Sequence, residues 1–300
     1  METLRLGYEA GSGPAPGRNR AILRSREPWV FLLDSDAEPA PGCLEELWRR
    51  AEEDPDAAVV SPRVLHADEP ERVQYDAGAA HFLGVMCFQN RDRRLEEAAE
   101  PDRSVTAAAS TALLLRRDRA LECGLFDEGM VFCREDLDFC LRIASAGHRI
   151  VHAPQAVVLH GRGPARSSGD LRERRTFYQA RNRWWVLLKA LQWQTLLATL
   201  PLQLAYESLA LAGSAMRGEA RQHLAGLADV ACCLPGLLAA RRAFQRRRRV
   251  PDRALFSAAA LDWRQDTMDM FGARLAKPLF DRFCRAWWGM ALRLLPQHAA

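Results

Sequence analysis

Trp29-Val30-Phe31-Leu32-Leu33-Asp34-Ser35-Asp36 is the stretch of sequence that decides the fold. Its first five residues form a short, continuous apolar run, which predicts a strand buried inside a sheet. The two aspartates follow at the point where that strand ends. In open α/β sheets, ligands bind outside the carboxyl ends of the strands. The stretch therefore predicts both an α/β protein and a binding site at Asp34 and Asp36.

The sequence on the carboxyl side continues the pattern. Leu44, Leu47 and Trp48 recur on one face of a predicted helix over residues 42–53, and the apolar residues 57–60 predict a second strand. Strand, helix and strand in this order are typical of an α/β layer protein. Residues 67–105 are polar and carry no clear pattern.

The next part of the chain predicts a strand over residues 113–115 and a helix that begins near Glu135 and ends at Gly147. Two short strands are predicted over residues 149–152 and 156–159, with His160 at the end of the second. After Arg183 the composition changes. Residues 184–245 are rich in Leu, Ala and Trp and predict amphipathic helices. The chain is therefore divided into an α/β domain, residues 1–183, and a helical region, residues 184–300.

The composition excludes some classes of protein. The 300 residues carry a formal net charge of only +4, which does not indicate a nucleic-acid partner. None of the eight cysteines forms a Cys-x-x-Cys pair, so a zinc ribbon or a redox motif is not expected. Cysteines scattered among apolar residues fit a reduced, cytoplasmic setting.

Asp34 and Asp36 are the first candidate site. Two carboxylates one residue apart in a loop can hold Mg²⁺ or Mn²⁺, which bridges the phosphates of a nucleotide. The alternative is an aspartate pair that shapes the turn or caps the next helix. The two residues alone leave both interpretations open.

Glu135 and Asp136 form the second candidate site, at the start of a helix. Acidic residues there are often only complements to the helix dipole, worth about 0.3–1 kcal/mol. Asp138 has a simple explanation, because Arg142 lies four residues further on and can pair with it. Asp136 has no such partner. A carboxylate that projects from a helix start can serve as a general base.

His160 and Arg181 are single candidates. A neutral imidazole is a common ligand for divalent metals, although a lone histidine in a loop is often an ordinary surface residue. Arg181 lies among aromatic residues, and arginine suits phosphate recognition. Arginine beside aromatic residues also suits a membrane interface, and the simplest alternative is a helix with a charged face.

These motifs, in this order, resemble family-2 glycosyltransferases, which have the GT-A nucleotide-diphospho-sugar transferase fold. The similarity covers about residues 5–185. The matching segments are Trp29–Asp36 (a strand ending in Asp-x-Asp), Leu113–Arg117 with Gly124–Glu128 (a strand, a basic pair and G-x-F-D-E), Glu135–Arg142 with Ala146-Gly147 (the E-D-x-D helix), Val157–His160 (a strand-end histidine) and Arg181-Asn182 (a late R-N pair).

The resemblance implies roles for these residues. Asp34 and Asp36 would hold Mg²⁺ or Mn²⁺ and the diphosphate of a nucleotide-sugar donor. His160 would be a further contact to the metal or to a phosphate, and Arg181 would contact the donor. Asp136 would be the base that deprotonates the acceptor hydroxyl, with Glu135 beside it. The reaction would be a direct displacement at the anomeric carbon with inversion, in the synthesis of a surface polysaccharide on a glycan or lipid-linked acceptor.

The sequence also departs from the family pattern. Members begin with a strand, a helix and a strand that cradle the nucleotide base, whereas residues 4–8 here already resemble the third-strand region. A partial, N-terminally incomplete GT-A-like sheet is therefore expected, and donor binding is the function most affected. The alternative is a non-catalytic, membrane-associated binding protein derived from such an enzyme. A phosphoester hydrolase that uses the same aspartates is a third possibility.

The helical region is the expected membrane contact. Its apolar and aromatic residues, with Arg183 and Lys189 alongside, are typical of helices in the bilayer interface. The arginines within residues 241–253 could contact anionic head groups, each worth about 1 kcal/mol near the surface. A soluble helical subdomain is the alternative. The resemblance favours the membrane, because many such transferases extend lipid-linked glycans, and places the protein peripherally at the cytosolic face.

Overall fold

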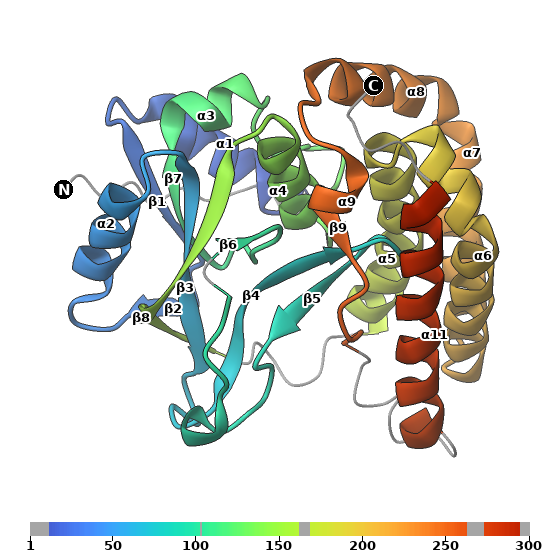
Figure 1. Cartoon of the computed structure of the whole chain (residues 1–300), viewed down its shortest axis with the longest axis horizontal. Coiled ribbons are helices and arrows are strands. Elements are labelled where there is room, and N and C mark those ends of the chain that lie inside the picture. Colours follow the sequence, from blue (N-terminus) through green and yellow to red (C-terminus); the bar gives the residue numbers. More distant parts are fainter. Residues whose placement is uncertain (1–11, 103, 162–168, 263–272, 295–300) are drawn as a thin grey trace. The chain divides into compact units, whose positions relative to one another are not determined.

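The computed structural model describes residues 12–102, 104–161, 169–262 and 273–294. The chain forms two compact units (Figure 1). Unit 1 comprises Met1–Ala79 and Phe88–Ser167, and unit 2 comprises Ala80–Cys87 and Ser168–Ala300. The boundary predicted at residue 183 falls inside helix α5 (Gly169–Ala190), so the change of unit comes about one helix earlier than the change of composition.

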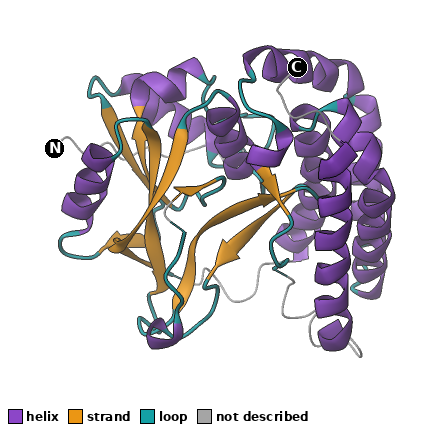
Figure 2. Cartoon of the chain, viewed as in Figure 1, coloured by secondary structure: helices purple, strands orange, loops and turns teal. Residues whose placement is uncertain are grey.

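A mixed sheet forms the centre of unit 1 (Figure 2). Its main strands lie in the order β1-β7-β3-β4-β5, and β8 pairs with β2, β3 and β6. The β3–β8 pairing is parallel, whereas β1–β7, β3–β7 and β2–β8 are antiparallel. The strands are β1 (Trp29–Leu33), β2 (Ala37–Pro39), β3 (Ala57–His66), β4 (Val73–His81), β5 (Val85–Gln89), β6 (Ser104–Val105), β7 (Ala112–Arg116) and β8 (Arg149–His160).

Helices cover both faces of this sheet. Leu113 and Leu115 of β7 belong to a core cluster with residues of α1, α3 and α4, whereas Leu114 belongs to a second cluster with α2. Because neighbouring strand residues point to opposite faces, a strand covered on both sides must be apolar throughout. The helices are α1 (Ala15–Arg24), α2 (Cys43–Glu53), the 3₁₀ turn η1 (Leu95–Glu97), α3 (Arg117–Glu122) and α4 (Glu135–Ser145).

Unit 2 is a helical bundle that contains the tip of the β4–β5 hairpin. Phe82 at that tip stacks on Trp288 with the ring centroids 5.1 Å apart, and its carbonyl accepts a hydrogen bond from Gln203. Strand β9 (Phe256–Ser257) pairs with Ala80 and His81 at the end of β4. The helices, besides α5, are α6 (Trp193–Met216), α7 (Ala220–Cys232), α8 (Leu234–Arg247), α9 (Asp252–Leu255) and α11 (Ala273–Leu294).

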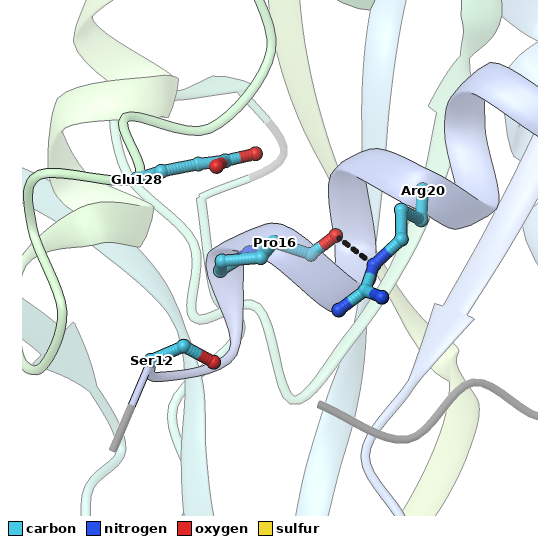
Figure 3. A pocket seen from close by; sticks show the side chains of 4 residues that line it. All are labelled: Ser12, Pro16, Arg20 and Glu128. Atoms are coloured by element: carbon cyan, nitrogen blue, oxygen red, sulfur yellow. Dashed lines mark hydrogen bonds between the residues drawn. The ribbon is translucent and has the colours of Figure 1, made fainter. Parts of the chain in front are cut away.

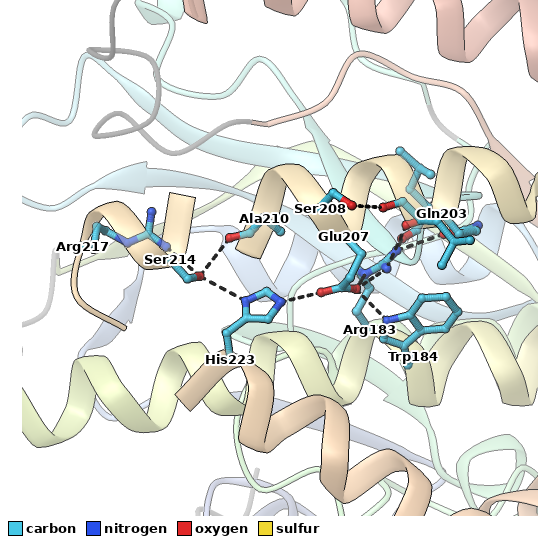
Figure 4. A network of polar contacts seen from close by, with 11 residues as sticks. Arg183, Trp184, Gln203, Glu207, Ser208, Ala210, Ser214, Arg217 and His223 are labelled. Atoms are coloured by element: carbon cyan, nitrogen blue, oxygen red, sulfur yellow. Dashed lines mark hydrogen bonds and ion pairs between the residues drawn. The ribbon is translucent and has the colours of Figure 1, made fainter. Parts of the chain in front are cut away.

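A buried ionic network joins three helices of unit 2 (Figure 4). Arg183 of α5 is almost fully buried and donates to Glu207 of α6 and to Leu83 O. The other oxygen of Glu207 lies 2.5 Å from His223 Nε2 of α7. Arg183 was expected to flank a membrane-facing stretch, but here it stabilises the interior of the bundle.

The structure confirms the α/β class and the helical C-terminal region. The strands predicted at residues 29–33 and 113–115 and the helices predicted at residues 42–53 and from Glu135 are present. Two predicted short strands are one continuous strand, β8, which runs through Pro154 with a register shift against β3. Residues 4–8, compared above with a third strand, lie outside the described residues.

Candidate metal and carboxylate site

Asp34, Asp36 and His160 come together at one end of the sheet of unit 1. Asp34 follows β1, and its backbone N–H is held by Thr111 O at 2.8 Å. Asp36 leads into β2, where Ala37 pairs with His160 of β8 and Asp36 O accepts from Gly161 N. One ligand atom of each residue lies within 4.8 Å of the other two. Strand pairing thus joins residues 124 positions apart in the sequence.

This cluster fits a divalent cation. Ligand atoms around one ion, at bonds of about 2.2 Å, lie at most about 4.4 Å apart, so only a small movement of the exposed Asp36 is needed. His160 Nε2 lies 3.4 Å from Asp36 Oδ1, which leaves room for a shared cation. Two carboxylates and an imidazole suit Mn²⁺ at least as well as Mg²⁺, which prefers oxygen ligands.

Arg18 of α1 links this cluster to the acidic start of α4. Its guanidinium lies 2.8 Å from Asp34 Oδ1 and 3.2 Å from Glu135 Oε1. Burial lowers the pKa of Arg18, but the charges of Asp34 and Glu135 outweigh it, so the pKa is raised. The helix itself is held in place by Asn19, which exchanges two hydrogen bonds with the backbone of Phe126.

Glu135 is a buried carboxyl, and Asp136 beside it is half-buried. Burial raises the pKa of both, the charge of Asp136 raises that of Glu135 further, and Arg18 opposes the shift. Glu135 Oε2 is buried and has no hydrogen-bond partner among the described residues. Asp136 Oδ1 accepts from Leu137 N at 2.8 Å. A carboxyl with a raised pKa is closer to the basicity that proton transfer near neutral pH requires.

The backbone before α4 is strained. Cys133 and Arg134 have φ values of 65° and 68°, in the left-handed region that residues other than glycine adopt at a cost of about 1–3 kcal/mol. This turn leads directly into Glu135 and Asp136, the first two residues of α4. Asp138 pairs with Arg142 at 2.9 Å as predicted, and Asp138 is buried while Arg142 is half-buried.

Arg181 belongs to unit 2 and has partners there. Its Nε lies 2.5 Å from Asp229 Oδ2 of α7, and its guanidinium stacks 3.9 Å from the centre of the Trp185 ring. These are the contacts of an arginine that packs two helices together. Contact between Arg181 and the donor stays a prediction.

Sequence reasoning missed two members of the site. No role was predicted for Arg18, although a basic residue at a helix start near acidic strand ends is a usable signal. Gln74 of β4 accepts a hydrogen bond from His160 Nδ1 at 2.7 Å. No signal pointed to it, because the segment 67–105 had no assigned structure.

A hollow lies beside the start of α1 (Figure 3). It has a volume of about 370 Å³ and is lined by Ser12, Pro16, Arg20 and Glu128. Arg20 bonds Pro16 O of its own helix, and Glu128 accepts from Asn19. None of the three cluster residues lines it.

Comparison with known proteins points to one family. The family model described as glycosyl transferase family 2 matches residues 8–122. A pre-mycofactocin glycosyltransferase of Mycobacterium tuberculosis is 32% identical over 52% of this chain and 31% of its own. An N-acetylglucosaminyl-diphospho-decaprenol L-rhamnosyltransferase of the same species is 30% identical over 55% of this chain and 62% of its own. The chain therefore spans less than two thirds of either relative.

Solved structures give a weaker match. The crystal structure of GalNAc-T7 with UDP, GalNAc and Mn²⁺ has a TM-score of 0.46 at 18% identity, over 65% of this chain and 38% of that one. A TM-score this low adds nothing to what the sheet of unit 1 already shows.

Proposed function

Because residues 8–122 match the model of glycosyl transferase family 2, we propose that the chain is a member of that family. In this proposal it transfers a sugar from a nucleotide-diphosphate donor to a hydroxyl group, with a divalent cation held by Asp34, Asp36 and His160. The observation that carries the proposal is the convergence of these three side chains at a strand end. The second supporting feature is Arg18, which ties the same place to Glu135, the neighbour of Asp136 in the sequence.

A bound cation would neutralise the charge that develops on the diphosphate as it leaves. The chain's own residues supply the rest of the chemistry. Asp136 accepts the proton of the acceptor hydroxyl, whose oxygen attacks the anomeric carbon while the bond from that carbon to the diphosphate breaks. Attack from the face opposite the leaving group inverts the anomeric centre. Arg18 holds Asp34 and can bind a phosphate oxygen.

The acceptor in this proposal is a glycan or a lipid-linked saccharide. The relative whose name contains diphospho-decaprenol acts on a saccharide attached to a lipid, which supports the lipid-linked alternative. Such an acceptor would bring the protein to the cytosolic face of a membrane.

Unit 2 has surfaces that suit a membrane interface. On α11, Leu275, Leu279 and Phe283 are more than half exposed and lie on one face of the helix, and Arg282 and Arg285 are exposed beside them. On α6, Trp193, Leu197 and Leu204 form a second exposed apolar stripe. The two helices pack together, with Trp287 donating to Ala198 O (Figure 1). Apolar faces with basic neighbours favour contact with anionic lipid.

Among the described helices, α6 is long and apolar enough to cross a membrane by length and composition alone. Glu207 lies within it and is bound to Arg183 and His223 inside unit 2. Because Glu207 is paired inside the bundle, we favour an α6 that lies at the membrane interface over an α6 that crosses the bilayer.

The arginine-rich segment divides into two groups. Arg241 and Arg248 are buried and donate to carbonyls at the end of α5, among them Leu188 O and Ala190 O. These two side chains satisfy free carbonyl groups at the end of α5 and are not available to lipid head groups. The exposed members are Arg242, Arg246, Arg247, Arg249 and Arg253.

Calorimetric titration with uridine or guanosine diphosphate, with and without Mn²⁺, tests the proposal. We expect binding that depends on Mn²⁺ in the wild type and is lost in Asp36→Asn. The exposed Asp118→Asn is a matched control that should bind normally. A folded wild type that binds neither nucleotide in the presence of Mn²⁺ would contradict the enzyme hypothesis. Binding without transfer to any acceptor would instead favour the non-catalytic binding protein.

A further inference from the structure

Gln74 lies between two histidines on neighbouring strands. His66 of β3 and His160 of β8 are paired in the parallel register. Gln74 Oε1 lies 2.7 Å from His160 Nδ1, and Gln74 Nε2 lies 3.3 Å from His66 Nδ1. On the far side, His66 Nε2 lies 2.9 Å from Asp92 Oδ1. The four side chains form one chain of hydrogen bonds that ends at the proposed cation site.

Asp92 determines which atoms donate and which accept along this series of hydrogen bonds. An ionised carboxylate only accepts hydrogen bonds, so His66 Nε2 carries a hydrogen and donates it. His66 Nδ1 of a neutral ring then has a lone pair and accepts from the Gln74 amide. That leaves the amide oxygen of Gln74 facing His160, where it can only accept. His160 Nδ1 must therefore be the protonated nitrogen.

The hydrogen on Nδ1 determines the state of Nε2, the other ring nitrogen of His160. When Nδ1 carries the hydrogen, a neutral imidazole presents a lone pair at Nε2. This lone pair faces Asp36 Oδ1 at 3.4 Å, and two acceptors this close repel each other unless a cation lies between them. The arrangement is the one in which an imidazole binds a metal through Nε2.

We propose that Gln74, supported by His66 and Asp92, is a positioning residue that keeps His160 in the tautomer and orientation required of a metal ligand. The inference rests on the proposed cation site. The competing explanation is that the same hydrogen bonds only join β3, β4 and β8. The two explanations differ in what they predict for metal affinity in a protein that stays folded.

Mn²⁺ affinity, measured from the electron paramagnetic resonance signal of free Mn²⁺ with and without uridine or guanosine diphosphate, tests this inference. Gln74→Met keeps the size of the side chain but removes the acceptor, and we expect binding about 10- to 100-fold weaker, the usual effect of losing such a supporting contact. Gln74→Glu retains an acceptor oxygen and should bind within about threefold of the wild type. Spin-echo measurements should show nitrogen coupling to Mn²⁺ in the wild type and its loss in Gln74→Met.

Gln89→Met is the matched control. Gln89 is also a half-buried strand glutamine with one hydrogen bond, from Asp102 N at 2.8 Å, and its loss should leave Mn²⁺ affinity unchanged. If Gln74→Met does not fold, His66→Phe replaces it, because it removes the acceptor of the Gln74 amide and the bond to Asp92 but leaves Gln74 itself in place. Unchanged affinity in the folded variant overturns the positioning role. No Mn²⁺ binding by the wild type, even with nucleotide, overturns the proposed cation site itself.

Discussion

The guanidinium of Arg18 donates to Asp34 Oδ1 across 2.8 Å, on one of the three side chains proposed to hold a cation. A cation that uses this oxygen must compete with Arg18 and lie close to a like charge. Once a nucleotide is bound, the same guanidinium becomes favourable, because it can pair with a phosphate. We therefore expect Arg18 to oppose binding of the cation alone and to support binding of the cation together with a diphosphate.

Arg18→Met should separate these two effects. We expect Mn²⁺ alone to bind about threefold to tenfold more tightly, because roughly 1 kcal/mol of charge repulsion is removed. Binding of uridine or guanosine diphosphate with Mn²⁺ should weaken about tenfold, because a phosphate contact of about 1.5 kcal/mol is lost. Arg20→Met, which removes an exposed arginine of the same helix, should change neither affinity. Weaker binding of Mn²⁺ alone in Arg18→Met would contradict the competition.

Asp136→Asn should abolish transfer while sparing the donor. Loss of a general base typically slows a reaction by about 10²- to 10⁴-fold. The affinity for nucleotide and Mn²⁺ should stay within about threefold, because Asp136 is not among the proposed ligands. Single-turnover transfer and calorimetry measure the two quantities separately. A variant that loses donor affinity but keeps its turnover would show that Asp136 serves binding instead.

Glu207 should make unit 2 sensitive to acid. Burial alone would raise the pKa of Glu207, but hydrogen bonds from His223 and Arg183 lower it to about 2. The unfolded chain binds a proton near pH 4.5, so the stabilisation is complete above that pH and is lost as the pH falls toward 2. The shift corresponds to about 3 kcal/mol at neutral pH.

Glu207→Gln should therefore lower the free energy of unfolding by about that amount at pH 7, with a smaller difference at pH 3. Urea denaturation at the two pH values measures it. Glu45→Gln on the exposed surface of α2 is the control and should have little effect at either pH. A difference that does not shrink as the pH falls would mean that lost packing, rather than ionisation, explains the change.

Gly226 permits the close packing of α5 and α7. A Cβ at this position would lie 2.4 Å from Phe177 O, so the helices would have to move apart. We expect Gly226→Ala to destabilise the protein by about 1–3 kcal/mol despite the better helix propensity of alanine. Gly236 of α8 has nothing within 4 Å of the same position, and Gly236→Ala should stabilise by about 0.5–1 kcal/mol. Thermal unfolding compares the pair.

Exposed arginines of α8 should contribute to membrane contact. The double variant Arg246→Gln and Arg247→Gln removes two charges worth about 1 kcal/mol each near an anionic surface, so binding should weaken about 30-fold. Sedimentation with vesicles containing phosphatidylserine measures the affinity. Arg24→Gln with Arg26→Gln removes two exposed charges from unit 1 and should have a smaller effect. Equal losses in both double variants would indicate attraction by overall charge without a docking surface.

The sequence predicted the parts of the site that local patterns define. An apolar run followed by Asp34 and Asp36 locates a buried strand and its polar end, and acidic residues at a helix start locate Glu135 and Asp136. The contribution of Gln74 could not be predicted in this way. Its proposed role comes from the pairing of β3 and β8, which places His66 beside His160. Strand pairing is a long-range property, and a polar segment gives no periodic signal for it.

The prediction for the arginine-rich segment was partly wrong for a related reason. Seven arginines between residues 241 and 253 predicted one basic surface, yet Arg241 and Arg248 are buried against the end of α5. Arginine can satisfy buried carbonyl groups as readily as it can face water. Whether an arginine is buried or exposed depends on its position on the helix relative to neighbouring elements. The sequence does not specify those neighbours.

The hairpin tip of residues 80–87 affects how the protein folds during synthesis and how it can be truncated. Phe82 and Leu83 are fully buried in unit 2, yet they are synthesised about ninety residues before α5 begins. A ribosome therefore releases an apolar tip long before the bundle that shelters it exists, and closing so long a loop carries an entropic penalty. Gene fragments cut after unit 1 would leave this tip in water. The two units are distinct in structure, but they should be expressed together in one chain.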